Sequence, residues 1–385
     1  MTSVHGAGDV RIFHKECRSL SNAGYEVVLI VPGKDDGVSG GVQLLSVPVL
    51  SSRFRRMAQT VWHVYRRALQ CRADIYHFHD PELLSAGLLL KLSGKCVVYD
   101  AHEDLPRQML SKSWIPSWSR EFLAKVVEWL ETWAAGRLDA VVTVTPTIAR
   151  RFPPGKTVVI HNYPRVEEFP SHDLSSYLAR PVAVAYVGAI SSIRGIREVM
   201  KAMSLLPESL QARLTVAGSF SPLELEMQSQ SFPGYNRTDF VGHLSRQGII
   251  QLLSEVRVGL VTLHPTPNYR DSLPIKLFEY MAAGLPVIAS DFPLWREIVN
   301  SSKCGLLVDP LNPRAIADSI QWLLEHADEA AEMGRRGREA VLTRYNWETE
   351  AARLIEMYRK LVGGPPALKE GAPCSTTHDR LSTIG

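Results

Sequence analysis

Two carboxylates and a lysine stand at fixed spacing in residues 271–279. Asp271 and Glu279 lie eight positions apart, with Lys276 between them. Pro274 suits the first position of a helix, because the missing N–H of proline costs nothing there. The amino end of a helix favours phosphate through unpaired N–H groups and the positive end of the dipole. Carboxylates nearby can accept hydrogen bonds from sugar hydroxyls. The segment therefore predicts a pocket for a sugar joined to a diphosphate.

The elements around this segment follow a regular pattern. The helix is expected to end at Gly284, because glycine adopts the left-handed conformation that often terminates helices. The apolar run Leu285–Ala289 then fits a short strand buried on both faces. Such runs alternate with helical patterns along the chain, which predicts parallel sheets with helices on both faces. The predicted strands are Val27–Val31, Ile75–Phe78, Cys96–Tyr99, Ala140–Val144, Val158–His161, Val182–Val187, Arg213–Ala217, Val258–Leu263, Val287–Ser290 and Gly305–Val308.

The chain is long enough for two doubly wound α/β domains. It has 385 residues, and the polar, proline-containing stretch 162–181 predicts a linker between the two series of strands. A first helix is expected over Arg11–Ala23, but only Met1–His5 precede its loop. The first strand of the sheet is therefore either very short or missing.

Composition excludes several classes of protein. A formal net charge of +3 does not favour nucleic acid as a partner. The five cysteines are scattered and form no metal-binding motif, which predicts reduced thiols, a cytoplasmic protein and no zinc site. The sequence has neither a secretory signal nor an apolar run that reaches the roughly 18 residues of a membrane span. If the protein meets a membrane, we expect it to lie on the surface.

The acidic pair carries a resemblance to a known family. An acidic residue followed eight positions later by glutamate resembles the motif of retaining GT-B glycosyltransferases of family 4. The resemblance covers about Val4 to Leu361 and is densest between Pro181 and Pro310. It implies that Asp271 contacts the donor sugar and Glu279 the ribose of the nucleotide. The family usually has glutamate first, so the shorter Asp271 is a departure that bears on the identity of the sugar.

The resemblance also implies a domain arrangement. Two Rossmann-like domains would face a cleft, an acceptor-binding one over residues 1–165 and a nucleotide-sugar-binding one over 178–344. A helix over 345–362 would cross back to the first domain. Residues 363–385 lack apolar periodicity, which predicts a disordered tail.

The first domain offers two histidine segments at the ends of predicted strands, where ligands bind in such sheets. His102 occupies the position from which the family's histidine reaches the transferred sugar, so His102 and Asp271 are the expected catalytic residues. His79 stands at the other strand end and is expected either at the acceptor or in an ordering role. Glu103 and Asp104 are candidates for orienting the acceptor hydroxyl.

The second domain supplies the expected donor-binding groups. Arg194 matches the basic residue that contacts the donor diphosphate in the family, after the glycine turn at Gly188. Guanidinium geometry suits two phosphate oxygens at once. We expect further donor contacts from Lys276 and from the backbone of Ser272 and Leu273. A glycine loop around Gly8 is a weaker candidate, with a plain turn as the alternative.

A mechanism follows from charge. Departure of a nucleoside diphosphate builds negative charge on the β-phosphate, which fixed cations and N–H groups would stabilise without a metal. The sequence contains no Asp-x-Asp, which agrees with a metal-independent enzyme. The resemblance implies a hexosyltransferase that retains anomeric configuration, uses a UDP-sugar or GDP-sugar as its substrate and needs no cofactor.

A region rich in arginine and tryptophan gives an indication of the class of acceptor. Six arginines and no acidic residue occur over residues 53–72, and four tryptophans follow at 114, 118, 129 and 133. Such a region fits a patch on anionic lipid, although a solvated helix face with core tryptophans explains it equally well. The acceptor is thus expected to be a saccharide, or a polyprenyl-linked one such as an O-antigen, lipopolysaccharide or capsule intermediate.

Two other functions are open. A sugar-nucleotide 2-epimerase on the same architecture would bind the same donor and form an epimer without an acceptor. A non-catalytic nucleotide-sugar-binding partner of another transferase would bind the donor and transfer nothing.

Overall fold

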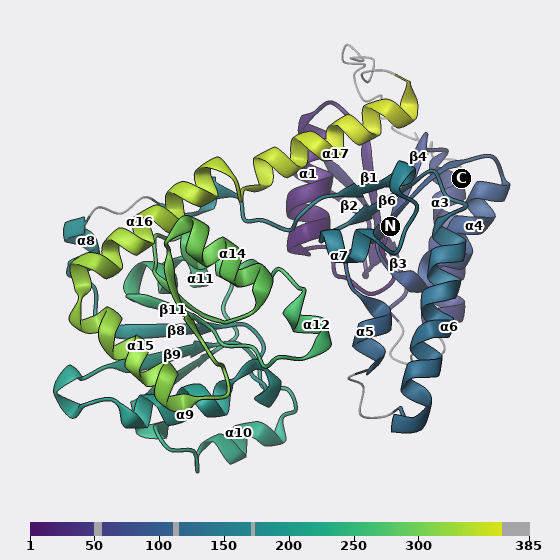
Figure 1. The fold of residues 1–385 in the computed structure, drawn as a ribbon. Coiled ribbons are helices and arrows are strands. Elements are labelled where there is room, and N and C mark those ends of the chain that lie inside the picture. Colours follow the sequence, from purple (N-terminus) through teal and green to yellow (C-terminus); the bar gives the residue numbers. More distant parts are fainter. Residues whose placement is uncertain (50–55, 111–114, 171–173, 364–385) are drawn as a thin grey trace, which may run out of the picture.

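The computed structural model describes residues 1–49, 56–110, 115–170 and 174–363. Two α/β halves lie beside each other, each built around a parallel sheet with helices on its faces (Figure 1). This architecture confirms the α/β fold class predicted from the alternating pattern.

The strands of the first half form two hydrogen-bonded groups. The order in one is β1-β3-β2, with β2 antiparallel, and in the other β4-β5-β6-β7, all parallel. Their bounds are β1 Val27–Pro32, β2 Gly37–Ser39, β3 Val42–Val47, β4 Ile75–Phe78, β5 Cys96–Ala101, β6 Ala140–Thr143 and β7 Thr157–Val159.

The first residues of the chain join these two groups of strands. The backbone N–H of Thr2 donates to Ile30 of β1 at 3.0 Å, and the N–H of His79 donates to Met1 at 3.2 Å. Met1 in turn donates to the carbonyl of His77 in β4 at 2.7 Å. These first residues therefore occupy the place of a short central strand, although they make too few hydrogen bonds to form a regular one.

The second half has one six-stranded parallel sheet in the order β10-β9-β8-β11-β12-β13. Its central strands are buried on both faces, as expected for a sheet covered by helices. The bounds are β8 Ala183–Val187, β9 Arg213–Ala217, β10 Thr238–Gly242, β11 Val258–Val261, β12 Val287–Ser290 and β13 Gly305–Val308.

Helices connect the strands throughout. In the first half they are η1 Val10–Cys17 (a π-helix), α1 Arg18–Asn22, η2 Arg56–Thr60, α3 Val61–Cys71, η3 Pro81–Leu83, α4 Leu84–Leu92, α5 Leu105–Leu110, α6 Ser117–Ala135, α7 Pro146–Ala149 and η4 Pro154–Lys156. In the rest of the chain they are η5 Val166–Glu168, α8 Leu174–Leu178, η6 Ser192–Arg194, α9 Ile196–Leu205, η7 Glu208–Leu210, α10 Glu224–Ser229, η8 Tyr235–Arg237, α11 Arg246–Glu255, α12 Pro267–Arg270, α13 Ile275–Ala282, α14 Pro293–Ser302, α15 Pro313–Glu325, α16 Ala327–Thr343 and α17 Trp347–Val362.

Helix α17 leaves the second half and packs on the first (Figure 1). Its residues Trp347, Leu354 and Tyr358 share one buried apolar cluster with Val98 of β5 and Val142 of β6. The residues between the two halves also carry apolar anchors, because Tyr163 and Phe169 are buried in the core of the second half. The polar stretch 162–181 is therefore partly packed rather than a loose tether.

Several local features differ from the sequence expectations. Strands β2, β3 and β10 do not appear among the predicted strands. Pro274 precedes α13 in an extended conformation instead of occupying its first helical position. Gly284 is left-handed, with φ +70°, as predicted. Among the described residues no helix is long and apolar enough to cross a membrane, and the four described cysteines form no disulfide. Residues 364–385 lie outside the described part of the chain.

Candidate active site

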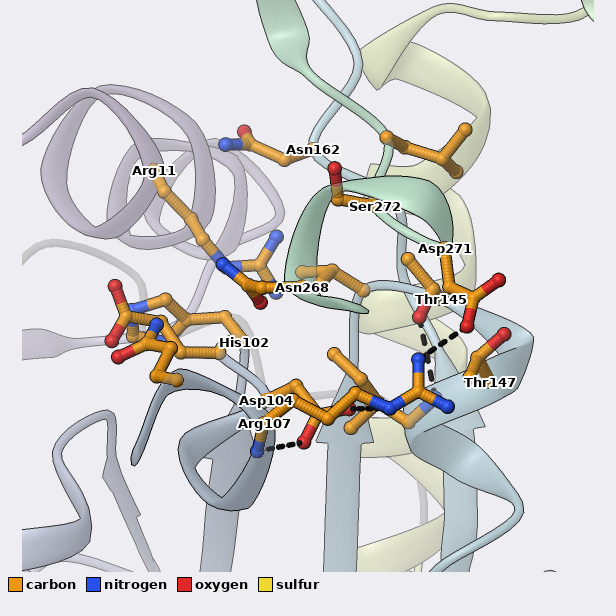
Figure 2. Close-up of a pocket in the computed structure, with 15 residues that line it drawn as sticks. Arg11, His102, Asp104, Arg107, Thr145, Thr147, Asn162, Asn268, Asp271 and Ser272 are labelled. Atoms are coloured by element: carbon orange, nitrogen blue, oxygen red, sulfur yellow. Dashed lines mark hydrogen bonds and ion pairs between the residues drawn. The ribbon is translucent and has the colours of Figure 1, made fainter. Parts of the chain in front are cut away.

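A cavity of about 200 Å³ lies between the two halves and is lined by both. The first half contributes η1, the segment after β5, α5, the start of α7 and Asn162 after β7. The second half contributes the end of α12 and the loop before α13 (Figure 2). The lining residues include Arg11, His102, Arg107, Asp271, Ser272 and Leu273.

An ion pair crosses this cavity. Arg107 of α5 donates to the carboxylate of Asp271, which ends α12 (Figure 2). The Arg107 guanidinium also lies 3.5 Å from Asp104. The side chains of Arg107 and Asp271 remain 35% and 46% exposed, so a ligand in the cleft has access to both.

Hydrogen bonds from the protein interior fix the loop that precedes α13. Trp295 is fully buried and its indole N–H donates to the carbonyl of Ser272 at 2.7 Å. The Ser272 hydroxyl donates to the carbonyl of Tyr269 at 3.0 Å. Because these contacts fix the loop, residues 271–273 are presented at the cleft while α13 runs away from it into the core.

Two cations meet over a glycine close to the start of α13. Gly188 follows β8 with φ +110°, and a Cβ built on it would lie 3.5 Å from Nη1 of Arg194 and 3.9 Å from Nζ of Lys276. Lys276 Nζ donates to the carbonyl of Val187 at 3.1 Å. Neither cation forms an ion pair with any described residue. Basic groups without an ion-pair partner beside a glycine turn suit the binding of a dianion.

Burial acts on one of these cations. The Lys276 side chain is almost wholly buried, and this burial, reinforced by the Arg194 charge and opposed by Glu279, lowers the pKa of Lys276 to about 7. A bound phosphate would favour the protonated form.

Glu279 lies further along α13 and is buried. Its carboxylate forms an ion pair with Arg246, the first residue of α11, which also donates to Glu168 at 2.8 Å. Lys15 of η1, whose pKa burial lowers to about 7, lies close enough for its charge to interact with Glu279. Glu279 therefore stands where the two halves of the chain meet.

His102 follows directly after β5 and lines the cleft, with 14% of its side chain exposed. Its Nδ1 lies 3.6 Å from Oδ1 of Asp100, which is completely buried. The ring centroid lies 5.5 Å from that of His5. The geometry thus presents one edge of the imidazole to the buried carboxylate and leaves part of the ring open to the cleft.

Comparison with known sequences agrees with this arrangement. Residues 8–163 match the family described as Glycosyltransferase Family 4, and residues 178–340 match the family described as Glycosyl transferases group 1. The chain belongs to the family 4-like GT-B glycosyltransferases.

Individual relatives are distant. Glycogen synthase of Mycobacterium tuberculosis is 23% identical over 254 residues, which are 63% of this chain and 59% of that protein. The chain therefore spans less than two thirds of this curated relative. The structure of sucrose-phosphate synthase from Thermosynechococcus elongatus has a TM-score of 0.72 at 21% identity, covering 90% of this chain and 92% of that one. The structure of Anabaena HepE in complex with UDP-glucose has a TM-score of 0.70 at 17% identity, covering 89% of this chain and 95% of that one.

The glycosyltransferase fold gathers most of the residues singled out in the sequence. Around the cleft it places His102, Glu103, Asp104, Asp271, Ser272 and Leu273. Gly188, Arg194 and Lys276 form a second group. The Asp104 carboxylate is engaged inside the protein, because it accepts from the N–H of Arg107 at 3.3 Å and lies 3.4 Å from the guanidinium of Arg151.

Glu279 lies further along α13, and two other predicted residues belong neither to the cleft nor to the group around Gly188. His79 is buried behind it, with Nδ1 3.3 Å from Asp100, so the structure favours the ordering role over acceptor contact. Gly8 lies in an exposed turn before η1, where an added Cβ would meet nothing within 4 Å, as in a plain turn.

Sequence reasoning missed Arg107, Arg246 and Asp100. Arg107 and Arg246 lie in helices that carry no motif, and only the fold brings each beside its carboxylate. Asp100 had a signal, since it stands at the end of a buried strand two residues before His102.

Proposed function

We propose that this glycosyltransferase moves a sugar from a nucleoside-diphosphate sugar to a saccharide or lipid-linked acceptor in the interdomain cleft. The observation that carries the proposal is the convergence of Arg194 and Lys276 over Gly188, close to the start of α13. Neither side chain forms an ion pair within the described part of the chain, and both lie near the loop that reaches the cleft. A diphosphate there would place its sugar toward Asp271.

The chemistry follows from where charge develops. When the bond between the anomeric carbon and the β-phosphate oxygen breaks, the diphosphate gains negative charge. Arg194, Lys276 and N–H groups at the start of α13 would stabilise that charge in fixed positions. We propose that they act without a metal ion. Mutational loss of one such fixed group typically reduces a rate by roughly 10²–10³-fold.

The remaining groups have proposed roles around the sugar and the nucleoside. Asp271 accepts hydrogen bonds from donor-sugar hydroxyls, and His102 contacts the same sugar from the first half. Glu279 binds the ribose after Arg246 yields its hydrogen bond. The acceptor attacks from the face that the leaving group vacates, which retains the anomeric configuration. UDP is the favoured nucleotide, supported by the similarity of the fold to HepE, which was solved with UDP-glucose.

A transfer assay tests the proposal. The protein is incubated with UDP-, GDP-, ADP- and TDP-sugars and with saccharide or lipid acceptors, and released nucleoside diphosphate is measured. We expect release with at least one donor and its loss by at least about 10²-fold in Asp271→Ala. An epimerised sugar nucleotide in the absence of acceptor would instead identify an epimerase, and binding without release under any condition would identify a non-catalytic partner.

The class of acceptor is proposed from the surface of α6. Trp118, Phe122, Trp129 and Trp133 are all exposed, and their spacing places them on one face of this helix. Trp118 is 86% exposed. Lys125 stands on the same face, and the Arg137 guanidinium lies 3.7 Å from the Trp133 ring centroid. Amphipathic aromatic rings beside basic groups suit the interface of an anionic membrane.

Neighbouring helices extend this surface. Helix α4 contacts both α3 and α6, and Leu89, Leu92 and Trp62 on α4 and α3 are exposed. Helix α5, which lines the cleft, packs against α6. A lipid-linked saccharide held at this surface would therefore be close to the cavity. Arg53, Arg55 and Trp114 of the predicted patch lie outside the described residues.

A further inference from the structure

The cluster behind His102 is unusually rich in buried ionisable groups. Arg11, Glu16, His79 and Asp100 are each at most 5% exposed, and His77 joins them by stacking on His79 at 4.7 Å. Such groups are expensive to bury unless each finds a partner. Hydrophobic packing alone therefore does not explain why these groups are buried together.

Asp100 stands at the centre of this cluster. Its Oδ2 accepts from Nη2 of Arg11 at 2.8 Å and from Nε of Arg11 at 3.1 Å, and it lies 3.3 Å from Nδ1 of His79. Burial pushes the pKa of Asp100 upward, but the Arg11 charge and the histidines outweigh it and hold the pKa well below its ordinary value. The carboxylate is therefore ionised, with Oδ2 committed to Arg11.

The other oxygen of this carboxylate faces His102. Asp100 Oδ1 and His102 Nδ1 are both buried, neither has a hydrogen-bond partner among the described residues, and they lie 3.6 Å apart. A small rotation of the imidazole would close this gap to hydrogen-bond length. Each atom would then satisfy the other, which is the expected state for buried polar groups.

A metal ion is the alternative explanation of the cluster. Ligand atoms of Glu16, His77, His79 and Asp100 lie within 4.8 Å of one another. The guanidinium of Arg11, however, lies 3.0 Å from Glu16 and 2.8 Å from Asp100. Arg11 already contacts both carboxyl groups, so a divalent ion would have to displace it. The geometry favours a fixed internal ion pair.

We propose that Asp100 is a positioning residue that accepts a hydrogen bond from Nδ1–H of His102 and so leaves Nε2 as an acceptor toward the cleft. Arg11 holds the carboxylate in place from the opposite side. In this tautomer His102 can accept a hydrogen bond from a sugar hydroxyl, which the Nε2–H form cannot do. The functional part of this inference rests on the proposed transfer reaction.

Asp100→Asn has a defined expected effect. The donors of Arg11 would take the amide oxygen, which turns the amide NH₂ group toward His102. That group would donate a hydrogen bond to Nδ1 and so favour the tautomer that carries its proton on Nε2. The variant therefore keeps the shape of the side chain and reverses the tautomer. Glu16→Gln is the matched control, because it replaces the other acidic side chain beside Arg11, which contacts Arg11 and His79 rather than His102.

The tautomer is measured by ¹⁵N NMR of the histidine ring in the whole chain, without ligand. We expect Nδ1–H at His102 in the unmodified protein and in Glu16→Gln, and Nε2–H in Asp100→Asn. Should Asp100→Asn not fold, the unmodified protein still decides: Nε2–H at His102 overturns the proposal. An unchanged tautomer in a folded Asp100→Asn also overturns it.

A double-mutant cycle separates positioning from a general structural role. With the donor identified in the transfer assay, Asp100→Asn is expected to lower kcat at least about tenfold with little change in the donor KM. In a protein that already carries His102→Ala, Asp100→Asn should cause no further decrease in kcat. An additive loss would show that Asp100 does not act through His102. If no donor is found, the proposed function is wrong. The NMR measurement of the His102 tautomer needs no donor and still tests the role of Asp100.

Discussion

Arg107 and Asp271 form an ion pair although 164 residues separate them in the sequence. One belongs to α5 of the first half and the other ends α12 of the second, so the contact joins the two walls of the cleft. The Asp271 carboxylate that is proposed to bind the donor sugar is thus engaged by a cation before any ligand arrives. A donor must share or replace that contact.

Removal of Arg107 tests how much this contact contributes. Both side chains are more than one third exposed, so solvent screens the pair and its contribution stays below about 1 kcal/mol. Arg107→Ala should therefore change the free energy of unfolding little and reduce kcat/KM at most about fivefold, as measured by urea denaturation and steady-state kinetics. Arg335→Ala removes an exposed ion pair on α16 and serves as the control. A loss of about 10³-fold in the first variant would contradict a purely bridging role.

Asp271→Glu tests the departure from the usual family residue. Glutamate is one methylene longer and would reach further toward the donor sugar. We expect the variant to keep nucleotide binding and transfer, and to change the ranking of donor sugars in the assay. The explanation fails if the ranking stays the same while the rate falls as far as in Asp271→Ala.

The lowered pKa of Lys276 predicts a pH-dependent affinity. A bound diphosphate favours protonated Lys276 and raises its pKa above the value of about 7 in the unliganded protein. Affinity should be greatest below about pH 7 and fall as the pH rises toward 9, with proton uptake on binding. Calorimetry in buffers of different ionisation enthalpy measures both effects.

Lys276→Met is the control for that experiment, because it keeps the length of the side chain and removes the titrating group. Its affinity should be lower, and proton uptake attributable to this position should vanish. Equal proton uptake in the two proteins would assign the effect to another residue.

The aromatic face of α6 predicts binding to anionic vesicles. Trp118→Ser combined with Phe122→Ser should reduce vesicle flotation by at least about tenfold, because each large side chain contributes roughly 1.5–3 kcal/mol when it leaves water. Trp322→Ser, on α15 of the second half, is the matched control. The membrane proposal is abandoned if the double variant floats as well as the unmodified chain, or if neither protein floats.

The sequence was sufficient for the elements that local patterns determine. Buried strands such as Val287–Ser290 are short apolar runs bounded by turn residues, and the predicted and observed bounds agree. Gly284 likewise adopts the positive φ that its position at a helix end predicts. The short strand β2 was not predicted, because all three of its residues are exposed and no apolar pattern indicates a strand there.

Contacts between distant segments could not be predicted in this way. The burial of His79 depends on η1, β4 and β5 meeting in one cluster, and no spacing within residues 77–82 encodes that. The exposure of Trp118, Trp129 and Trp133 depends on which face of α6 packs inward. Composition alone allowed a core role for these tryptophans, and the fold excludes it.

Calorimetric titration with UDP and GDP tests whether a diphosphate binds beside Gly188. We expect at least one nucleotide to bind the unmodified protein and Arg194→Ala to weaken that binding at least about tenfold. Arg197→Ala, which removes an exposed arginine of the neighbouring α9, should leave the affinity unchanged. Failure of both nucleotides to bind, or equal affinity in Arg194→Ala and the unmodified protein, would contradict a diphosphate site beside Gly188.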